Sequence, residues 1–261
     1  MSVAGGSLAA EGVAVMVGER AILRPTTLCF APGLVVGVLG HNGSGKSTLL
    51  KCLARQLAPS VGRVTLDGTP AAAWGARAFA RRLAYLPQQT PAATGLTGRE
   101  LVAFGRYPWH GPLGAIGAAG RAAVADAMAL TGTAPFADRA VDLLSGGERQ
   151  RVWIAMAVAQ DTAFVLLDEP IAALDLGHQM EVLGTLRTLA RSRNAGIVLV
   201  LHDITMAARF CDRLVALRGG AVVADGTPAD LLRPDVLEGL YGIPMRVLRD
   251  PASGAPVAVP A

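Results

Sequence analysis

Short apolar runs separated by glycine- and proline-rich breaks dominate the first third of the chain. Each run is short and ends at turn-forming residues, which is typical of strands rather than helices. The pattern of apolar and polar residues changes near Thr97, where Ala, Leu and Arg recur at helical spacing in Thr97–Arg106 and again in Arg121–Leu130. We expect the strands of the first third at Gly12–Val17, Leu34–Leu39, Gly62–Leu66 and Leu83–Leu86.

From Gly146 onward, helical patterns alternate with the near-continuous apolar runs Phe164–Leu167 and Gly196–Leu201. Strands of this kind are typical of a parallel sheet that helices cover on both faces. The whole pattern predicts an α/β core with a helical insert. The expected divisions are a core with an N-terminal β subdomain at 1–90, a helical subdomain at 91–150, the rest of the core with a C-terminal helix at 151–249, and a poorly ordered tail at 250–261.

The chain is apolar enough to make a membrane segment worth a search, since 52% of its 261 residues are hydrophobic. Charged residues, Pro or Gly interrupt each candidate before the ~18 apolar residues that a spanning helix needs. The stretch from Tyr107 to Gly120 contains several glycines and prolines and is expected to be a loop. The first ten residues lack the features of a secretory signal, so we expect a cytosolic protein.

Neither the cysteines nor the net charge indicates a function of its own. Cys29, Cys52 and Cys211 have no metal-binding or redox spacing and are expected to be reduced thiols. The net charge of +4 permits contact with nucleic acid or an anionic membrane, but Lys and Arg are dispersed along the chain. No basic block favours a nucleic-acid partner, and we expect none.

The first motif with clear chemistry is G-H-N-G-S-G-K-S, from Gly40 to Ser47, which follows the apolar run Leu34–Leu39. A strand, a glycine-rich turn and a helix beginning at Lys46 and reaching about Ala54 form a phosphate-binding loop. Backbone N–H groups and the helix N-terminus make the loop an anion site. Lys46 is expected to reach the β- and γ-phosphates of a nucleotide, and the Ser47 hydroxyl to bind Mg²⁺.

The strand Phe164–Leu167 ends in two adjacent carboxylates, Asp168 and Glu169. Acidic residues at the carboxyl end of a parallel strand lie where ligands bind in open α/β sheets. Together with a phosphate-binding loop, they favour Asp168 as a water-mediated Mg²⁺ partner and Glu169 as the general base that activates water. Taken alone, the same run could be a strand with a solvated acidic turn.

A third motif, L-S-G-G-E-R-Q, runs from Leu144 to Gln150 and precedes the helical run Arg151–Ala159. Ser145 can cap that helix, and its N-terminus with two glycines forms another potential anion site. A plain helix cap is the alternative when the string is considered by itself.

This string resembles the signature motif of ATP-binding cassette (ABC) ATPases, and further landmarks follow in the family's order. Gln88 matches the Q-loop glutamine, Asp175 the D-loop aspartate and His202 the switch histidine. The resemblance implies a RecA-like P-loop NTPase core with an inserted α-helical signature subdomain, and ATP and Mg²⁺ as cofactors. It implies catalytic roles for Glu169, His202, Gln88 and Lys46, and Mg²⁺ binding by Ser47, Gln88 and, through water, Asp168. The nucleotide contacts that it implies are Gly40, His41, Asn42, Gly43, Ser44, Gly45, Lys46, Ser47 and Thr48, with Ser145, Gly146, Gly147 and Asp175.

Several segments are similar to the ATPase subunits of iron(III)-siderophore importers, most of all those of the hydroxamate, ferrichrome-type branch. Gly105–Gly111 is the most discriminating, although an aromatic loop packed within the helical subdomain explains it as well. The resemblance implies a head-to-tail dimer of two copies, a separate integral membrane permease and, indirectly, a periplasmic or lipid-anchored substrate-binding protein. It implies a peripheral location at the cytoplasmic face of the inner membrane. Haem, cobalamin or a catecholate siderophore stay open as cargo, as does a non-transport ATPase that acts on nucleic acid or ribosomes.

Three positions depart from the family pattern, two before the D-loop and one near the expected adenine site. Ile171 and Ala172 stand where the family usually has Thr and Ser before the D-loop, so two hydroxyls near the expected subunit interface are absent. Val17 stands where many relatives place an aromatic ring against adenine, so we expect only apolar contact there.

Overall fold

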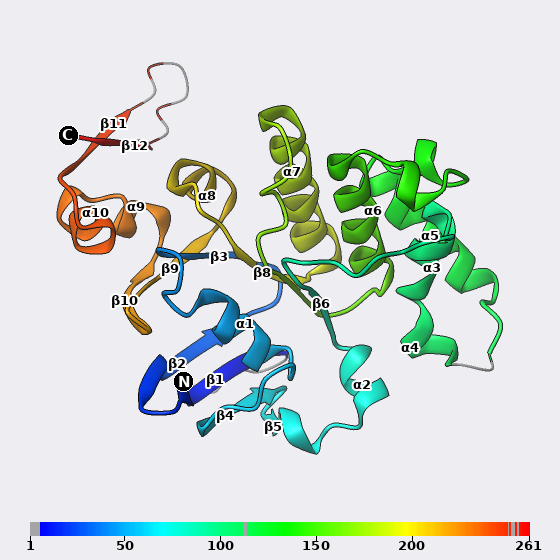
Figure 1. Cartoon of the computed structure of the whole chain (residues 1–261), viewed down its shortest axis with the longest axis horizontal. Coiled ribbons are helices and arrows are strands. Elements are labelled where there is room, and N and C mark those ends of the chain that lie inside the picture. Colours follow the sequence, from blue (N-terminus) through cyan, green and yellow to red (C-terminus); the bar gives the residue numbers. More distant parts are fainter. Residues whose placement is uncertain (1–5, 112–113, 250, 252–253, 255) are drawn as a thin grey trace.

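The computed structural model describes residues 6–111, 114–249, 251, 254 and 256–261. The N-terminal sheet lies at one side of the molecule, the helical insert at another, and the C-terminal hairpin far from both (Figure 1). The first part of the chain contains β1 (Leu8–Val17), β2 (Arg20–Phe30), β3 (Val35–Leu39), α1 (Lys46–Leu53), β4 (Val61–Leu66), β5 (Thr69–Pro70), η1 (Ala71–Ala73), α2 (Ala76–Ala80) and β6 (Leu83–Leu86).

The larger sheet has the order β10-β9-β3-β8-β7-β6, and all neighbours except β9 and β10 run parallel. The strand β3 is buried along its whole length, as expected for a parallel sheet with both faces covered. Gly37 in its centre is required by packing, because a Cβ there would lie 2.9 Å from Cys211 Sγ. The smaller sheet is antiparallel, with the order β2-β1-β4-β5. The elements after the insert are β7 (Phe164–Leu167), α7 (Leu176–Arg193), β8 (Gly196–Val200), α8 (Ile204–Phe210), β9 (Arg213–Arg218), β10 (Ala221–Gly226), α9 (Pro228–Leu231), α10 (Pro234–Tyr241), β11 (Met245–Arg249) and β12 (Pro256–Pro260).

The helical insert packs onto the core through one long helix, α6 (Gly146–Ala159). Its first-turn cap is a capping box in which Ser145 Oγ accepts from Glu148 N while Glu148 Oε2 accepts from Ser145 N. The expected boundary at residue 150 falls inside this continuous helix, so α6 joins the insert to the core. The other elements of the insert are α3 (Gly98–Phe104), α4 (Tyr107–His110), α5 (Ala118–Leu130), η2 (Ala134–Phe136) and η3 (Val141–Leu143).

The structure differs from the sequence-based expectation in two segments. Within the expected loop, Tyr107–His110 forms the single helical turn α4 and Ala118–Gly120 begins α5. Pro112 and Leu113 lie outside the described residues. The tail expected to be poorly ordered contains β12, which pairs with β11. Its alternating Val and Ala residues fit a strand, and its prolines stand only at the two ends, where a strand tolerates them. Four residues of that tail, 250, 252, 253 and 255, lie outside the described part of the chain. So do residues 1–5, at the N-terminus where a secretory signal would begin.

Within the described ranges no helix is long and apolar enough to span a membrane. The same residues contain no cluster of three or more His, Cys, Asp or Glu side chains placed to hold a metal ion.

Candidate functional site

The loop after β3 adopts a shape that only glycine allows at three positions. Gly40, Gly43 and Gly45 have φ values of 143°, 75° and 101°, in the region that L side chains rarely adopt. At Gly40 a Cβ would also lie 2.2 Å from the carbonyl oxygen of Leu217, and at Gly45 it would lie 2.9 Å from that of Ile22. Gly40 and Gly45 therefore bring the backbone close to its neighbours, while Gly43 supplies only the positive φ that the turn into α1 requires.

Lys46 is the first residue of α1, and its side chain folds back over the loop. It is 4% exposed, and Nζ donates to the carbonyl oxygens of Gly40 at 2.7 Å and His41 at 2.9 Å. Burial lowers the pKa of Lys46, while the carboxylates of Glu169 and Asp168 oppose that shift. Ser44 Oγ is buried nearby without a hydrogen-bond partner among the described residues. A buried cation with an unsatisfied hydroxyl beside it fits a site that accepts phosphate oxygens.

Asp168 lies beside the loop, at the carboxyl end of β7. Its side chain is almost fully buried, and its Oδ1 accepts from Ser47 Oγ at 2.9 Å. Burial raises the pKa of Asp168, and the hydrogen bond from Ser47 works in the opposite direction. The carboxylate and hydroxyl oxygens that the sequence assigns to Mg²⁺ are thus adjacent, and oxygen atoms are the ligands that this ion prefers.

Glu169 is held between two polar side chains that follow different strands, β6 and β8. Its Oε2 accepts from Gln88 Nε2 at 2.8 Å, and its Oε1 lies 2.8 Å from His202 Nε2. Glu169 also has a φ of 53°, a left-handed conformation that is uncommon for a residue with a long side chain. Strained backbone persists only where the surrounding structure maintains it, and it is concentrated at functional sites.

One cavity of about 310 Å³ lies at the phosphate-binding loop (the P-loop) and is lined by Lys46, Ser47 and Glu169, whereas Asp168 lies outside the lining, behind Ser47. Ile22 in β2 contributes to its wall although it belongs to no motif, whereas Val17 is 66% exposed and is not part of the lining. The structure thus offers Ile22 rather than Val17 beside the phosphate-binding loop. The lining consists of Ile22, Asn42, Gly43, Ser44, Gly45, Lys46, Ser47, Thr48, Gln88, Glu169 and His202.

Gly40 and His41 support this cavity without lining it. Their carbonyl oxygens hold Lys46, and the His41 ring packs edge-on against Tyr241 with centroids 5.5 Å apart. Tyr241 lies at the end of α10, about 200 residues away in sequence, and no motif marks it. Only the fold places it beside the P-loop.

The signature and D-loop residues are not part of the same cavity. Ser145 and Gly146 are exposed at the start of α6, and the pKa of Glu148 is held below its usual value by the hydrogen bond from Ser145 N. Asp175 caps α7, where its Oδ1 accepts from His178 N at 2.9 Å. Gly147 lies beside Ser145 and Gly146 in the same turn. One subunit therefore carries two separate groups of the predicted nucleotide contacts.

The two residues that depart from the family pattern before the D-loop have different surroundings. Ile171 is 7% exposed and belongs to the core, and its carbonyl oxygen accepts from Gln179 Nε2 at 3.3 Å. Ala172 is exposed, so the missing hydroxyl at that position leaves an apolar methyl group at the surface.

The site has the composition of an ATP-hydrolysing cassette: a P-loop, an acidic pair after β7 and a histidine after β8 around one cavity. Comparison with known proteins agrees, because the profile described as "ABC transporter" matches residues 23–172. The chain is 45% identical over 228 residues to the achromobactin transport ATP-binding protein of Dickeya dadantii (strain 3937), covering 87% of this chain and 85% of that relative. It is 38% identical to the iron(3+)-hydroxamate import ATP-binding protein of Bacillus subtilis (strain 168), over 97% and 94% of the two chains.

Solved structures show the same fold. A putative metal-chelate type ABC transporter in an inward-facing conformation superposes with a TM-score of 0.85, at 24% identity and 98% coverage of both chains. A dimeric bacterial ABC transporter cassette gives a TM-score of 0.75 at 26% identity, covering 85% of this chain and 98% of the other. The protein belongs to the ABC transporter family, whose ATP-binding subunits hydrolyse ATP to drive transport.

Proposed function

We propose that this chain is the ATP-hydrolysing subunit of an ABC importer for an iron(III)-siderophore, of the hydroxamate type, and that it acts through a separate membrane permease. The observation that supports ATP hydrolysis is the position of Glu169, held between Gln88 and His202 at the edge of the P-loop cavity. This arrangement places a carboxylate where it can accept a proton from water beside a bound γ-phosphate.

Different residues of the cavity bind the phosphates and promote hydrolysis. Lys46 leaves its loop carbonyls to contact the β- and γ-phosphates, and the loop N–H groups from Gly43 to Thr48 bind the remaining phosphate oxygens. Glu169 acts as the general base, and His202 supports the γ-phosphate from the opposite side. Ser47, Gln88 and, through water, Asp168 would hold Mg²⁺, which would supply positive charge to neutralise the phosphates.

The second group of residues completes the site of another copy. Ser145 and Gly146 are exposed, with Gly147 following, at the N-terminus of α6, which carries partial positive charge. In a head-to-tail dimer they contact the γ-phosphate bound to the partner's P-loop, and Asp175 lies at the junction. Closure of the dimer is then favoured by ATP because ATP gains contacts there that the open state lacks.

The cargo assignment rests on resemblance. The achromobactin and iron(3+)-hydroxamate relatives at 45% and 38% identity support an iron chelate. The hemin import ATP-binding protein of Rhodococcus jostii (strain RHA1), at 42% identity over 97% of this chain, supports haem as the second candidate. In either case the subunit works at the cytoplasmic face of the membrane, with a permease that receives cargo from a periplasmic or lipid-anchored binding protein.

Co-purification and uptake together test this proposal. The tagged chain should bring down a multi-span permease, and a deletion strain should lose uptake of labelled ferric hydroxamate while keeping that of hemin. Loss of hemin uptake alone would transfer the assignment to haem. Recovery of ribosomes or DNA in place of a permease would contradict a transport function.

A further inference from the structure

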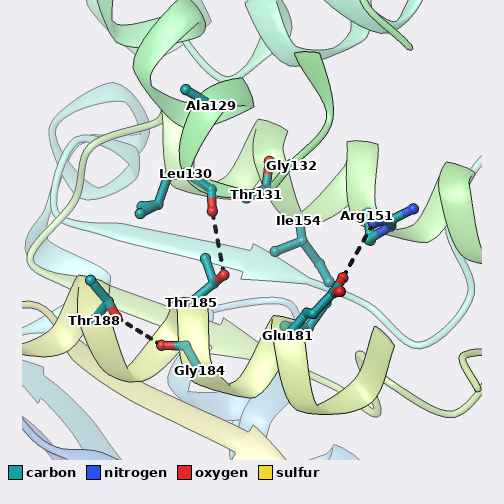
Figure 2. Close-up of a pocket in the computed structure, with 11 residues that line it drawn as sticks. Ala129, Leu130, Thr131, Gly132, Arg151, Ile154, Glu181, Gly184, Thr185 and Thr188 are labelled. Carbon is teal, nitrogen blue, oxygen red and sulfur yellow. Dashed lines mark hydrogen bonds and ion pairs between the residues drawn. The ribbon is translucent and has the colours of Figure 1, made fainter. Parts of the chain in front are cut away.

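A second cavity, of about 480 Å³, lies between α5, α6 and α7 and shares no residue with the P-loop cavity. Figure 2 shows α7 forming one wall and the end of α5 with α6 forming the other. Its volume is within the ~300–1,000 Å³ that is usual for small-molecule sites. Nothing in the proposed hydrolysis uses this cavity.

Arg151 stands at one end of the cavity with most of its hydrogen-bonding capacity unused. Its side chain is 12% exposed, and its Nε is buried with no partner in the described part of the chain. Its ion-pair partner there, Glu181, is 3.6 Å away, which is too far for a hydrogen bond. The Phe136 ring, 5.5 Å from the guanidinium carbon, offers only a cation–π contact. The Nε atom itself is closed off, but the rest of this largely buried guanidinium has only the long ion pair with Glu181 and can pair with another anion.

The remaining polar groups of the cavity already have partners. Thr185 Oγ1 donates to Leu130 O at 3.3 Å, and Thr188 Oγ1 donates to Gly184 O at 2.9 Å (Figure 2). The walls between them include the apolar side chains of Leu130, Ile154 and Val182. The cavity thus has the Arg151 guanidinium, held only by a long ion pair, at one end and an apolar interior.

We propose that this cavity binds a small amphipathic carboxylate, with the carboxylate on Arg151 and the apolar body between α5 and α7. Guanidinium and carboxylate groups match in a two-bond geometry, which Glu181 does not achieve from its present position. Because the Glu181 side chain is 66% exposed, it can turn into solvent when another carboxylate takes its place.

Binding of octanoate to the nucleotide-free protein tests the proposal, with amide chemical shifts in α5, α6 and α7 as the readout. Octanoate should shift these signals, whereas octanol and octylammonium at equal concentration should not. Glu181→Gln should bind octanoate several-fold more tightly, because the competing carboxylate is removed, and Arg151→Gln should bind it at least tenfold more weakly. Arg99→Gln, at an exposed ion pair on the insert, is the matched control and should bind as wild type does.

Three results would overturn the proposal. They are equal binding of octanol and octanoate, absence of binding in both the wild type and Glu181→Gln, and unchanged affinity in Arg151→Gln. The comparison of the three probes needs no variant, so it stands even if Arg151→Gln does not fold. ATP binding is measured separately, so failure here leaves the proposed transport function untouched.

Discussion

Replacing Glu169 by Gln should nearly abolish ATP turnover while leaving the fold and ATP binding in place. The amide oxygen can still accept from Gln88 Nε2, and the new NH₂ group faces His202 Nε2, which accepts in its other tautomer. Since each contact changes from charge-assisted to neutral, the cost in stability is about 1 kcal/mol per contact. Loss of a general base slows the reaction by roughly 10²–10⁴-fold. That loss equals about 2.7–5.4 kcal/mol in the barrier, well above the effect on either contact.

Three measurements distinguish a lost base from a damaged site. Gel filtration with ATP and Mg²⁺ should show a stable dimer of Glu169→Gln, because ATP closes the dimer and is not consumed. ATPase assays give the rate, and thermal unfolding shows that the fold persists. Glu100→Gln makes the same carboxylate-to-amide change in the capping box of α3, outside the cavity, and should keep full turnover. A monomeric Glu169→Gln protein with wild-type ATPase activity would refute the assignment.

The remaining predictions concern phosphate binding, the composite site and coupling to transport. Lys46→Ala should lose most of its affinity for a fluorescent ATP analogue, because Lys46 supplies the buried positive charge; unchanged affinity and hydrolysis would remove its role. Ser145→Arg should bind ATP as a monomer without hydrolysing it, and wild-type turnover per subunit should rise with protein concentration; an active variant with concentration-independent turnover would contradict a shared site. Trp109→Ala should impair ferric hydroxamate uptake more than basal ATPase activity, since Trp109 lies between Arg81 and Arg106 at the junction of α2 and the insert. Phe104→Ala, at an exposed ring in α3, is the comparison variant, and equal loss of uptake and ATPase activity in Trp109→Ala would indicate a structural role.

The apolar runs predicted most of the parallel sheet but missed strands at its margin and in the N-terminal sheet. β3, β6, β7 and β8 lie within one or two residues of the expected runs, because continuous apolar stretches bounded by turns leave little choice. β2 was not anticipated, since its alternation of exposed and buried residues is broken by Arg24 and Pro25. β12 was missed for a different reason: its composition is typical of disorder, and its pairing with β11 depends on tertiary contacts.

Local motifs were informative about the P-loop, whose chemistry is contained in one short stretch of chain. The close approach of Gln88, Glu169 and His202 was expected from family order alone, and the structure supplies the distances. Ile22 and Tyr241 could not be found in this way, because each reaches the site through the fold and belongs to no motif. Val17, across the β1–β2 turn from Ile22, is exposed and outside that lining, so its expected apolar contact with adenine stays a prediction.

Two contacts inside one subunit join the signature helix to the segment that follows Glu169. Gln150 Nε2 in α6 donates to Pro170 O at 3.1 Å, and a Cβ at Gly147 would lie 3.1 Å from Leu174 Cδ2. The segment between Pro170 and Leu174 therefore cannot move far without moving α6, since one contact is a hydrogen bond and the other is a close approach that glycine permits. Within the proposed dimer, Glu169 acts on the subunit's own ATP while the N-terminus of α6 contacts the partner's. In that proposed dimer, these two contacts would connect the nucleotide sites through the side chains of Gln150 and Leu174, and neither contact uses a side-chain hydroxyl at position 171 or 172.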